Sequence, residues 1–160
     1  MEQNETWKQK IILWAKNKLI VDKEIFESNM KIRGIYGIFL NKKCVYVGKS
    51  SNIHERMFNT RNGHITKLQQ RDHFIKDLNY NTGISISILK KVPYKFDNYY
   101  KDLQRLASVE TKIISKYQRK NQCLEQVPEG KHITLEKWKE LKYNNSKKCR
   151  SIFRKLKCLI

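Results

Sequence analysis

The sequence predicts an α+β domain in which a small three-stranded antiparallel sheet is flanked by helices, with an N-terminal helix and a basic helical C-terminal tail. Two short segments, residues 34–40 and 44–48, have the composition of β-strands, and residues 84–89 alternate isoleucine with serine. The segments around them have apolar residues at helical spacing. Helices packed on such a sheet bury the apolar faces of both, which is the usual α+β solution.

The N-terminal segment is predicted to be a helix. Trp7, Ile11, Trp14 and Ala15 follow helical spacing, with lysines between them. We expect this helix to pack on the main domain, because an isolated helix of this length is only marginally stable in water.

The next elements are predicted to be a hairpin and a short helix. Residues 41–43 suit a tight turn between the first two strands. Asn52 is a candidate N-cap, and Glu55 follows it by three residues, the spacing of a capping box. The short helix should continue to about residue 60.

A second helix is expected over residues 65–78, which place apolar side chains on one face. A turn at residues 81–83 then leads into the third strand, residues 84–89, and Pro93 ends that part of the chain.

A long helix should begin after Asp97 or Asn98, either of which could cap it, and continue to about Tyr117. Its expected inward face is Tyr99, Leu103, Leu106, Glu110, Ile113 and Tyr117. Glu110 is the one carboxylate in this set. Burying an unpaired carboxylate is costly, so we expect Glu110 to have a partner: a basic residue, several hydrogen-bond donors or a metal ion. Further helices are predicted at residues 135–141 and 152–159.

The charge of the chain favours a polyanionic partner. Its 160 residues include 34 Lys and Arg against 15 Asp and Glu, a net charge of +19. Nucleic acid is the first choice, since each neutralised phosphate releases a counterion, and an anionic membrane surface is the second. Residues 131–160 are the most basic stretch, with 10 basic and 2 acidic residues. No apolar segment is long enough to span a membrane.

The four cysteines are dispersed, without the spacing of a zinc site. We therefore expect reduced thiols and a cytoplasmic location, in a bacterial or phage-infected cell.

Two tyrosine motifs on the hairpin resemble the GIY-YIG endonuclease family. They are Gly34-Ile35-Tyr36 and Tyr46-Val47-Gly48, followed directly by Lys49 and, eight residues after Gly48, by Arg56. The resemblance covers residues 32–125. It implies a metal-binding Glu on a later long helix, where Glu110 lies, and an Asn beyond it, where Asn121 lies.

The resemblance implies hydrolysis of a DNA phosphodiester, most readily in double-stranded DNA, with one Mg²⁺ or Mn²⁺ ion on Glu110. Arg56 offers a planar fork suited to phosphate, and Lys49 offers a point charge. Tyr36 is the first choice for the group that activates water, and Tyr46 is the second. The expected nucleic-acid contacts are Lys49, Arg56, Arg61, His64 and Asn121.

One departure from the family is a missing histidine. Many members have one a helical turn after the arginine, where this chain has Thr60. His54 and His64 are the nearest, and we interpret both as surface residues, although His64 could still reach nucleic acid.

The expected organisation is an N-terminal extension (1–31), a nuclease core (32–125) and a basic tail (126–160) that could bind DNA. A restriction enzyme, a phage or mobile-element nuclease and a structure-specific repair nuclease all remain open. So do an RNA substrate, a non-catalytic nucleic-acid-binding module and the oligomeric state.

Overall fold

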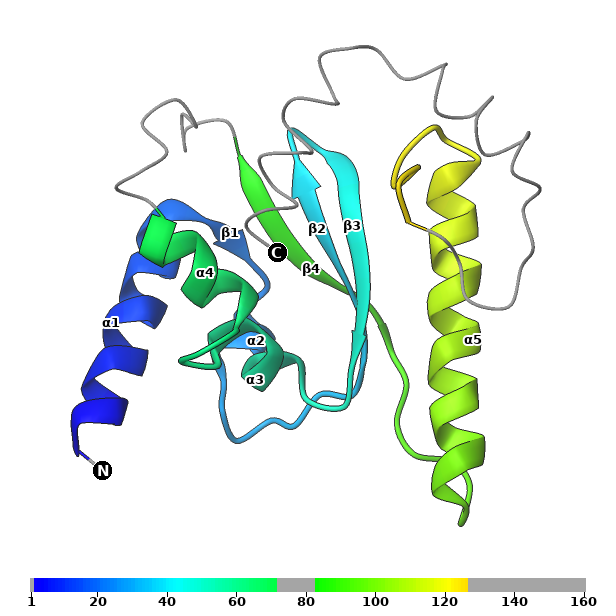
Figure 1. Cartoon of the computed structure of the whole chain (residues 1–160), viewed down its shortest axis with the longest axis horizontal. Helices are drawn as coiled ribbons and strands as arrows, with labels where there is room; N and C mark the ends of the chain where they lie inside the picture. The colour runs from blue at the N-terminus through cyan, green and yellow to red at the C-terminus, as the bar shows by residue number, and fades with distance from the viewer. Residues whose placement is uncertain (1, 72–82, 127–160) are drawn as a thin grey trace.

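The computed structural model describes residues 2–71 and 83–126. At the centre of this part of the chain lies a mixed four-stranded sheet in the order β1-β4-β2-β3 (Figure 1). Strands β2 (Gly34–Leu40) and β3 (Lys43–Ser50) form the antiparallel hairpin. Strand β4 (Ile84–Lys91) pairs antiparallel with the other side of β2. The α+β class is confirmed, but the expectation of three antiparallel strands is wrong.

The additional strand is β1 (Ile20–Val21), which pairs parallel with β4. Two residues are too short for an alternating pattern, so no signal of this strand is visible in the sequence. Asp22 extends the pairing, since its N–H donates to Ile86 O at 3.1 Å and its carboxylate accepts from Ile88 N at 2.7 Å. The one-turn helix α2 (Lys23–Phe26) follows and was also not predicted.

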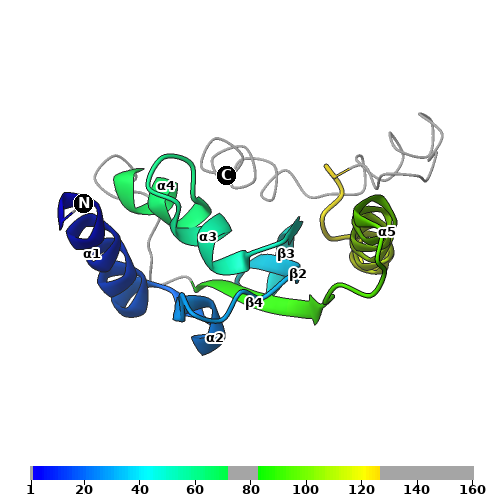
Figure 2. The same cartoon turned by 90° about the horizontal axis from the view of Figure 1, so that it is seen from below.

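Helices cover the two faces of the hairpin separately (Figures 1 and 2). Helices α3 (Ile53–Phe58) and α4 (His64–Arg71) lie on one side, with α1 (Glu2–Lys18) packed beside α4. Helix α5 (Tyr99–Gln118) packs on the other side, against β3 and β2. Because side chains alternate along a strand, β2 and β3 contribute to two different cores.

The first core joins the N-terminal segment to the sheet. Ile11 and Ala15 of α1 are buried in the same cluster as Tyr36 and Ile38 of β2 and Met57 of α3. The second core joins the other sheet face to α5 and includes Ile35, Val47, Leu106 and Ile114. The described part of the N-terminal extension is therefore packed into the domain.

Two asparagines begin the predicted helices. Asn52 Oδ1 accepts from Glu55 N at 3.2 Å, while the Glu55 carboxylate accepts from Asn59 Nδ2. Helix α3 ends at Phe58, two residues earlier than expected. Asn98, rather than Asp97, caps α5, because its Oδ1 accepts from the N–H groups of Tyr100 and Lys101.

The inward face of α5 differs from the predicted one at its first turns. Tyr99 and Leu103 are exposed, because the N-terminal end of α5 extends past the sheet (Figure 1). Asp102 is buried instead, where its carboxylate accepts from the N–H groups of Lys95 at 2.9 Å and Phe96 at 3.0 Å. These two donors compensate the burial of the carboxylate.

Some predicted elements fall on residues outside the described ranges. The second helix is confirmed as α4 as far as Arg71, and residues 72–82 are not described. The basic tail beyond residue 126, with its two expected helices, also lies outside the description. Across residues 2–71 and 83–126, no helix is long and apolar enough to cross a membrane.

Candidate active site

Two tyrosines lie together on the sheet face that α3 and α4 cover. Tyr36 pairs with Gly48, and Ile38 pairs with Tyr46, so both rings project from the same face as diagonal neighbours. Their centroids are 6.2 Å apart. Gly48 permits this arrangement, since a Cβ there would overlap Cζ and Oη of Tyr36. The two motifs thus place two phenols side by side.

His64, the first residue of α4, completes this cluster. Its Nε2 lies 2.7 Å from Tyr36 Oη, and its ring is 5.6 Å from each tyrosine ring. His64 and His54 are both buried, so the interpretation of these histidines as surface residues is wrong. His54 has a separate role, because its Nδ1–H donates to Ile25 O at 2.8 Å.

A tight turn brings His64 to this position. Gly63 N–H donates to Asn59 O, and a Cβ on Gly63 would overlap the backbone of Met57 and Asn59. This close approach lets the chain reverse between α3 and α4. The glycine directly before His64 was the available signal, although a glycine alone does not show which face the next side chain takes.

His64 is electrically neutral near pH 7. Burial lowers its pKa to about 3, and the positive charges of Arg56 and Lys67 add to the effect. In one tautomer Nε2 accepts a hydrogen bond from Tyr36 Oη–H, and in the other Nε2–H donates a hydrogen bond to Tyr36 Oη. Nδ1 is buried without a hydrogen-bond partner among the described residues. The imidazole is thus a neutral group in direct contact with a phenol.

Arg56, on α3, is the cation of the cluster. Its guanidinium lies beside the hydroxyl groups of Tyr36 and Tyr46, which favour its charged form. Burial raises the pKa of Tyr36, and the neighbouring Tyr46 raises it further, whereas Arg56 lowers it. Arg56 is half-buried and lines a cavity of about 210 Å³ together with Asn52 and Asn59. A small anion could therefore approach the guanidinium from solvent.

Lys49 and Glu110 form a second group, on the opposite face of the hairpin. Lys49 pairs with Ile35, so its side chain projects toward α5, where its Nζ lies 2.7 Å from Glu110 Oε2. The Glu110 side chain is 12% exposed and that of Lys49 is 27% exposed. The prediction that the inward-facing carboxylate needs a partner is therefore confirmed, and a basic residue supplies it.

Strand β3 connects the two groups. Gly48, on which the Tyr36 ring lies, directly precedes Lys49, and β3 is the last strand of the sheet. The two groups thus flank one sheet edge from opposite faces. Part of this edge is covered, since Gln122 accepts from Cys44 N and Gln126 bonds both the N–H and C=O of Val47. These glutamines satisfy backbone groups that an edge strand leaves unpaired, and they were not predicted.

Glu110 is the one metal ligand that the resemblance implies. The described residues contain no cluster of three or more His, Cys, Asp or Glu side chains placed to hold a metal. Mg²⁺ commonly binds one or two carboxylates together with water and substrate phosphates. One nearly buried carboxylate fits that pattern, with Lys49 occupying one of its oxygens in this structure.

Two predicted nucleic-acid contacts, Arg61 and Asn121, are exposed. Arg61 is exposed on the loop after α3, where its N–H donates to Asn59 Oδ1. Asn121 is exposed in the turn after α5, with φ of 59°. Eight residues of helix separate Glu110 from the end of α5, which is about 12 Å along its axis. The structure therefore does not bring Asn121 to Glu110.

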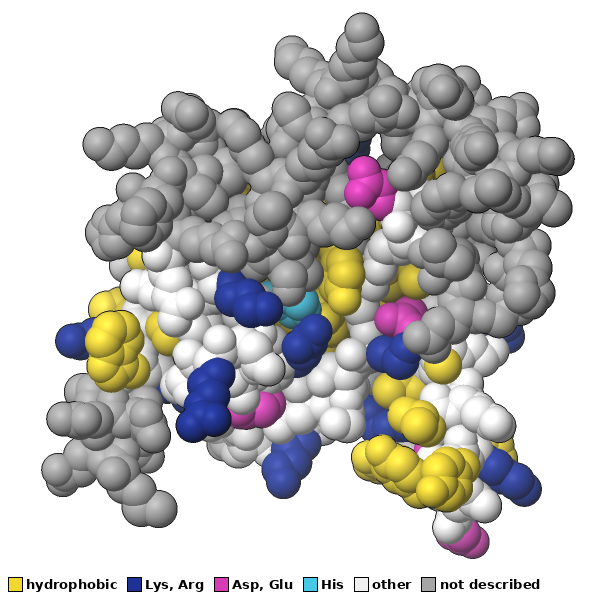
Figure 3. Space-filling model, in the orientation of Figure 1, with side chains coloured by type: hydrophobic (Ala, Val, Ile, Leu, Met, Phe, Trp, Pro, Cys, Tyr) yellow, Lys and Arg dark blue, Asp and Glu magenta, His cyan; other side chains and the backbone are white. Residues whose placement is uncertain are grey.

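Lysine and arginine side chains are spread over α3, α4 and the adjacent sheet on the face shown in Figure 3.

No family model, no curated protein and no solved structure matches this chain.

Proposed function

We propose that this protein is a metal-dependent endonuclease that hydrolyses phosphodiester bonds in DNA, as its resemblance to the GIY-YIG family implies. The observation that carries the proposal is the cluster of Tyr36, Tyr46, Arg56 and His64, in which Tyr36 and His64 are buried. A half-buried guanidinium and a chain of proton-carrying groups are what hydrolysis of an anionic ester requires. The net charge of +19 supplies affinity for the polyanion.

Arg56 binds the phosphate in this proposal. It lines a small open cavity, and its planar fork can donate to two phosphoryl oxygens together. The phosphoryl group gains negative charge as water attacks, so these hydrogen bonds stabilise the transition state more than the substrate.

Tyr46 is the better candidate for contact with the attacking water. Tyr36 is fully buried, whereas Tyr46 is half-buried. This reverses the order of preference that the sequence suggested. Tyr36 then has a positioning and relay role, because its hydroxyl interacts with Tyr46 on one side and His64 on the other.

The proton balance uses this chain of contacts. Water gives a proton to Tyr46 Oη as its oxygen bonds to phosphorus, Tyr46 passes its own proton to Tyr36, and Tyr36 passes one to His64 Nε2. The bond from phosphorus to the leaving oxygen breaks, and that oxygen takes a proton from solvent. His64 then returns its proton to solvent by the reverse path.

Substrate binding would make His64 a better proton acceptor. The charge of Arg56 is one cause of the lowered pKa of His64. A phosphate paired with Arg56 would offset that contribution to the shift, whereas the larger contribution, burial, would remain. The cluster would therefore accept a proton more readily with the phosphodiester in place.

Glu110 would hold the metal ion, and Lys49, which pairs with Glu110, would add a positive charge beside it. A bound Mg²⁺ or Mn²⁺ ion supplies charge stabilisation for the leaving oxygen.

The test is cleavage of supercoiled plasmid with Mg²⁺, with Mn²⁺ and with EDTA. We expect metal-dependent nicking that falls at least about 100-fold in Glu110→Gln, the scale on which removing a transition-state interaction slows a reaction. Glu24→Gln is the matched control, because Glu24 also pairs with a lysine, Lys91, but outside the candidate site.

Full activity in Glu110→Gln would remove the metal role. Tight DNA binding without cleavage under any metal condition would favour the non-catalytic binding module instead. Cleavage confined to an RNA substrate would replace the DNA assignment.

A further inference from the structure

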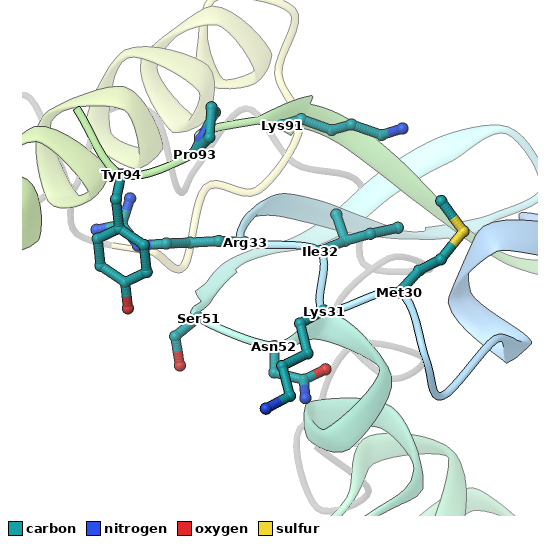
Figure 4. Close-up of a pocket in the computed structure, with 9 residues that line it drawn as sticks. All are labelled: Met30, Lys31, Ile32, Arg33, Ser51, Asn52, Lys91, Pro93 and Tyr94. Carbon is teal, nitrogen blue, oxygen red and sulfur yellow. The ribbon is translucent and has the colours of Figure 1, made fainter.

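A second cavity, of about 670 Å³, lies where β2 begins and β4 ends (Figure 4). Tyr94 and Met30 stand on opposite sides of it, Arg33 lies between them, and Lys31 and Asn52 line the rim (Figure 4). This volume is within the range of small-ligand sites. The cavity lies outside the Tyr36 cluster and the Lys49–Glu110 pair.

Arg33 holds Tyr94 in place against one side of the cavity. Its guanidinium donates to Val92 O at 2.7 Å and to Asp102 O at 2.8 Å, so the buried cation is fixed. Its Cζ lies 4.3 Å from the centroid of the Tyr94 ring, a cation–π contact. Tyr94 is nevertheless 60% exposed. A ring that keeps this much exposed surface beside a fixed cation is available for stacking.

Further exposed aromatic residues continue from Tyr94 onto the start of α5. Tyr99 is 64% exposed, Tyr100 is 74% exposed, and their rings are 5.9 Å apart. Figure 3 shows hydrophobic side chains gathered over this end of α5. We call the following set the aromatic patch: Tyr94, Phe96, Tyr99, Tyr100 and Leu103.

The charge around the aromatic patch selects its partner. Residues 90–105 contain five basic side chains and two acidic ones, and one of the acids, Asp102, is buried. Exposed tyrosines interleaved with cations are the features that bind single-stranded nucleic acid, in which bases stack on rings and phosphates meet cations. A second copy of this chain would instead bring two surfaces of the same charge together.

The second cavity shares two lining residues with the smaller cavity beside Arg56. Ser51 and Asn52 line both it and the smaller cavity beside Arg56. A strand whose phosphate contacts Arg56 can therefore continue past the start of α3 to Tyr94.

We propose that the second cavity and the aromatic patch bind an unpaired, single-stranded segment of DNA beside the cleavage point, with one base stacked on Tyr94. The position beside a cleavage point rests on the proposed endonuclease function, whereas the binding surface itself does not require cleavage. The expected substrate is therefore DNA that has a single-stranded segment next to the bond that is cut.

The test is fluorescence anisotropy of the full chain in EDTA, so that binding is measured without cleavage. The probes are a labelled single-stranded oligothymidylate and a blunt duplex of mixed sequence. Tyr94→Ala and Tyr100→Ala should each weaken single-strand binding by at least about fivefold, the low end of the stacking range. Duplex affinity should change by less than about twofold.

Trp7→Ala is the matched control, since Trp7 is an exposed aromatic residue on α1, away from the patch. Tyr94→Ala also removes the Arg33 contact, so circular dichroism must show that each variant is folded. Tyr100→Ala keeps the test valid if Tyr94→Ala is unstable, because the Tyr100 ring is exposed.

Unchanged single-strand affinity in folded Tyr100→Ala protein would overturn the proposal. So would an equal weakening on both probes, or a dimer in light scattering that Tyr100→Ala dissociates. A chain that cuts plasmid but keeps full single-strand affinity in the variants retains the proposed function and refutes this inference. If the chain never cuts DNA but the variants bind single strands more weakly, the binding surface is supported and the endonuclease function is refuted.

Discussion

Replacing Gly48 by alanine tests the geometry of the tyrosine cluster directly. A Cβ at position 48 would overlap Cζ and Oη of Tyr36 and approach Cε1 of Tyr46. The Tyr36 ring is fully buried in the first core, so it would have to move. Moving it separates Tyr36 Oη from His64 Nε2, which are 2.7 Å apart.

The expected decrease in stability has two parts. Forcing an extra carbon into a packed core costs about 1–3 kcal/mol. Leaving a buried hydrogen-bonding group without its partner costs a further ~1–3 kcal/mol. Because part of the strain and the broken hydrogen bond arise from one displacement, we expect a total of about 2–4 kcal/mol. For a chain of this size that corresponds to a fall in Tm of roughly 4–16 °C.

A double-mutant cycle with thermal and urea unfolding isolates the cause. Tyr36→Leu removes the atoms that the new Cβ would overlap, so Gly48→Ala should cost much less in that background. A Gly48→Ala protein as stable as wild type would refute the predicted overlap. Equal costs in both backgrounds would show that the strain arises elsewhere on β3.

Four other predictions concern chemistry and charge. Tyr46→Phe should reduce plasmid cleavage more than Tyr36→Phe, because Tyr46 is half-buried and can contact water, whereas Tyr36 is buried. A larger loss of cleavage in Tyr36→Phe would restore Tyr36 as the base. Arg56→Ala should reduce turnover about 100- to 1,000-fold with partial recovery in Arg56→Lys, and normal turnover in Arg56→Ala would exclude a phosphate role. The free energy of unfolding should fall as the pH drops from about 6.5 toward 3, and His64 should contribute up to about 1.4 kcal/mol per pH unit. The reason is that His64 takes up a proton in the unfolded chain, whereas its lowered pKa keeps it neutral in the folded protein. Urea titrations should show a shallower fall in His64→Gln, and identical pH profiles would refute the assignment. Deleting residues 131–160 should flatten the slope of log K against log salt by about 0.9 for each phosphate that the tail neutralises, whereas an unchanged slope in a folded core would exclude the tail from DNA binding.

Local patterns predicted much of this fold from sequence. The hairpin, the N-caps at Asn52 and Asn98 and the course of α5 each depend on residues near one another in the chain, where spacing and capping chemistry act. Strand β1 was missed because its two residues gain their structure from pairing with β4, which is distant in sequence. The exposed start of α5 was missed because an apolar spacing does not show where the sheet beneath it ends.

The candidate site shows the same division between local and long-range information. The motifs placed Tyr36 and Tyr46 together through hairpin register. They did not reveal that His64 would be buried against Tyr36, since that contact depends on the turn at Gly63 and the packing of α4. A histidine directly after a glycine gave only a weak signal.

In the proposed function, the alternation of side chains along β3 would let one short hairpin serve two chemical tasks. Gly48 leaves room for Tyr36 on one face, and Lys49 projects to Glu110 on the other. The proposed proton relay and the proposed metal ligand would therefore lie on opposite faces of the same strand. A metal ion on Glu110 would not have to compete with His64 for the same space, and the low pKa that burial gives His64 would keep the proton acceptor neutral. If this separation is functional, Lys49→Ala should impair cleavage while leaving the pH dependence of stability due to His64 unchanged. A variant that altered both would show that the two faces are coupled through β3.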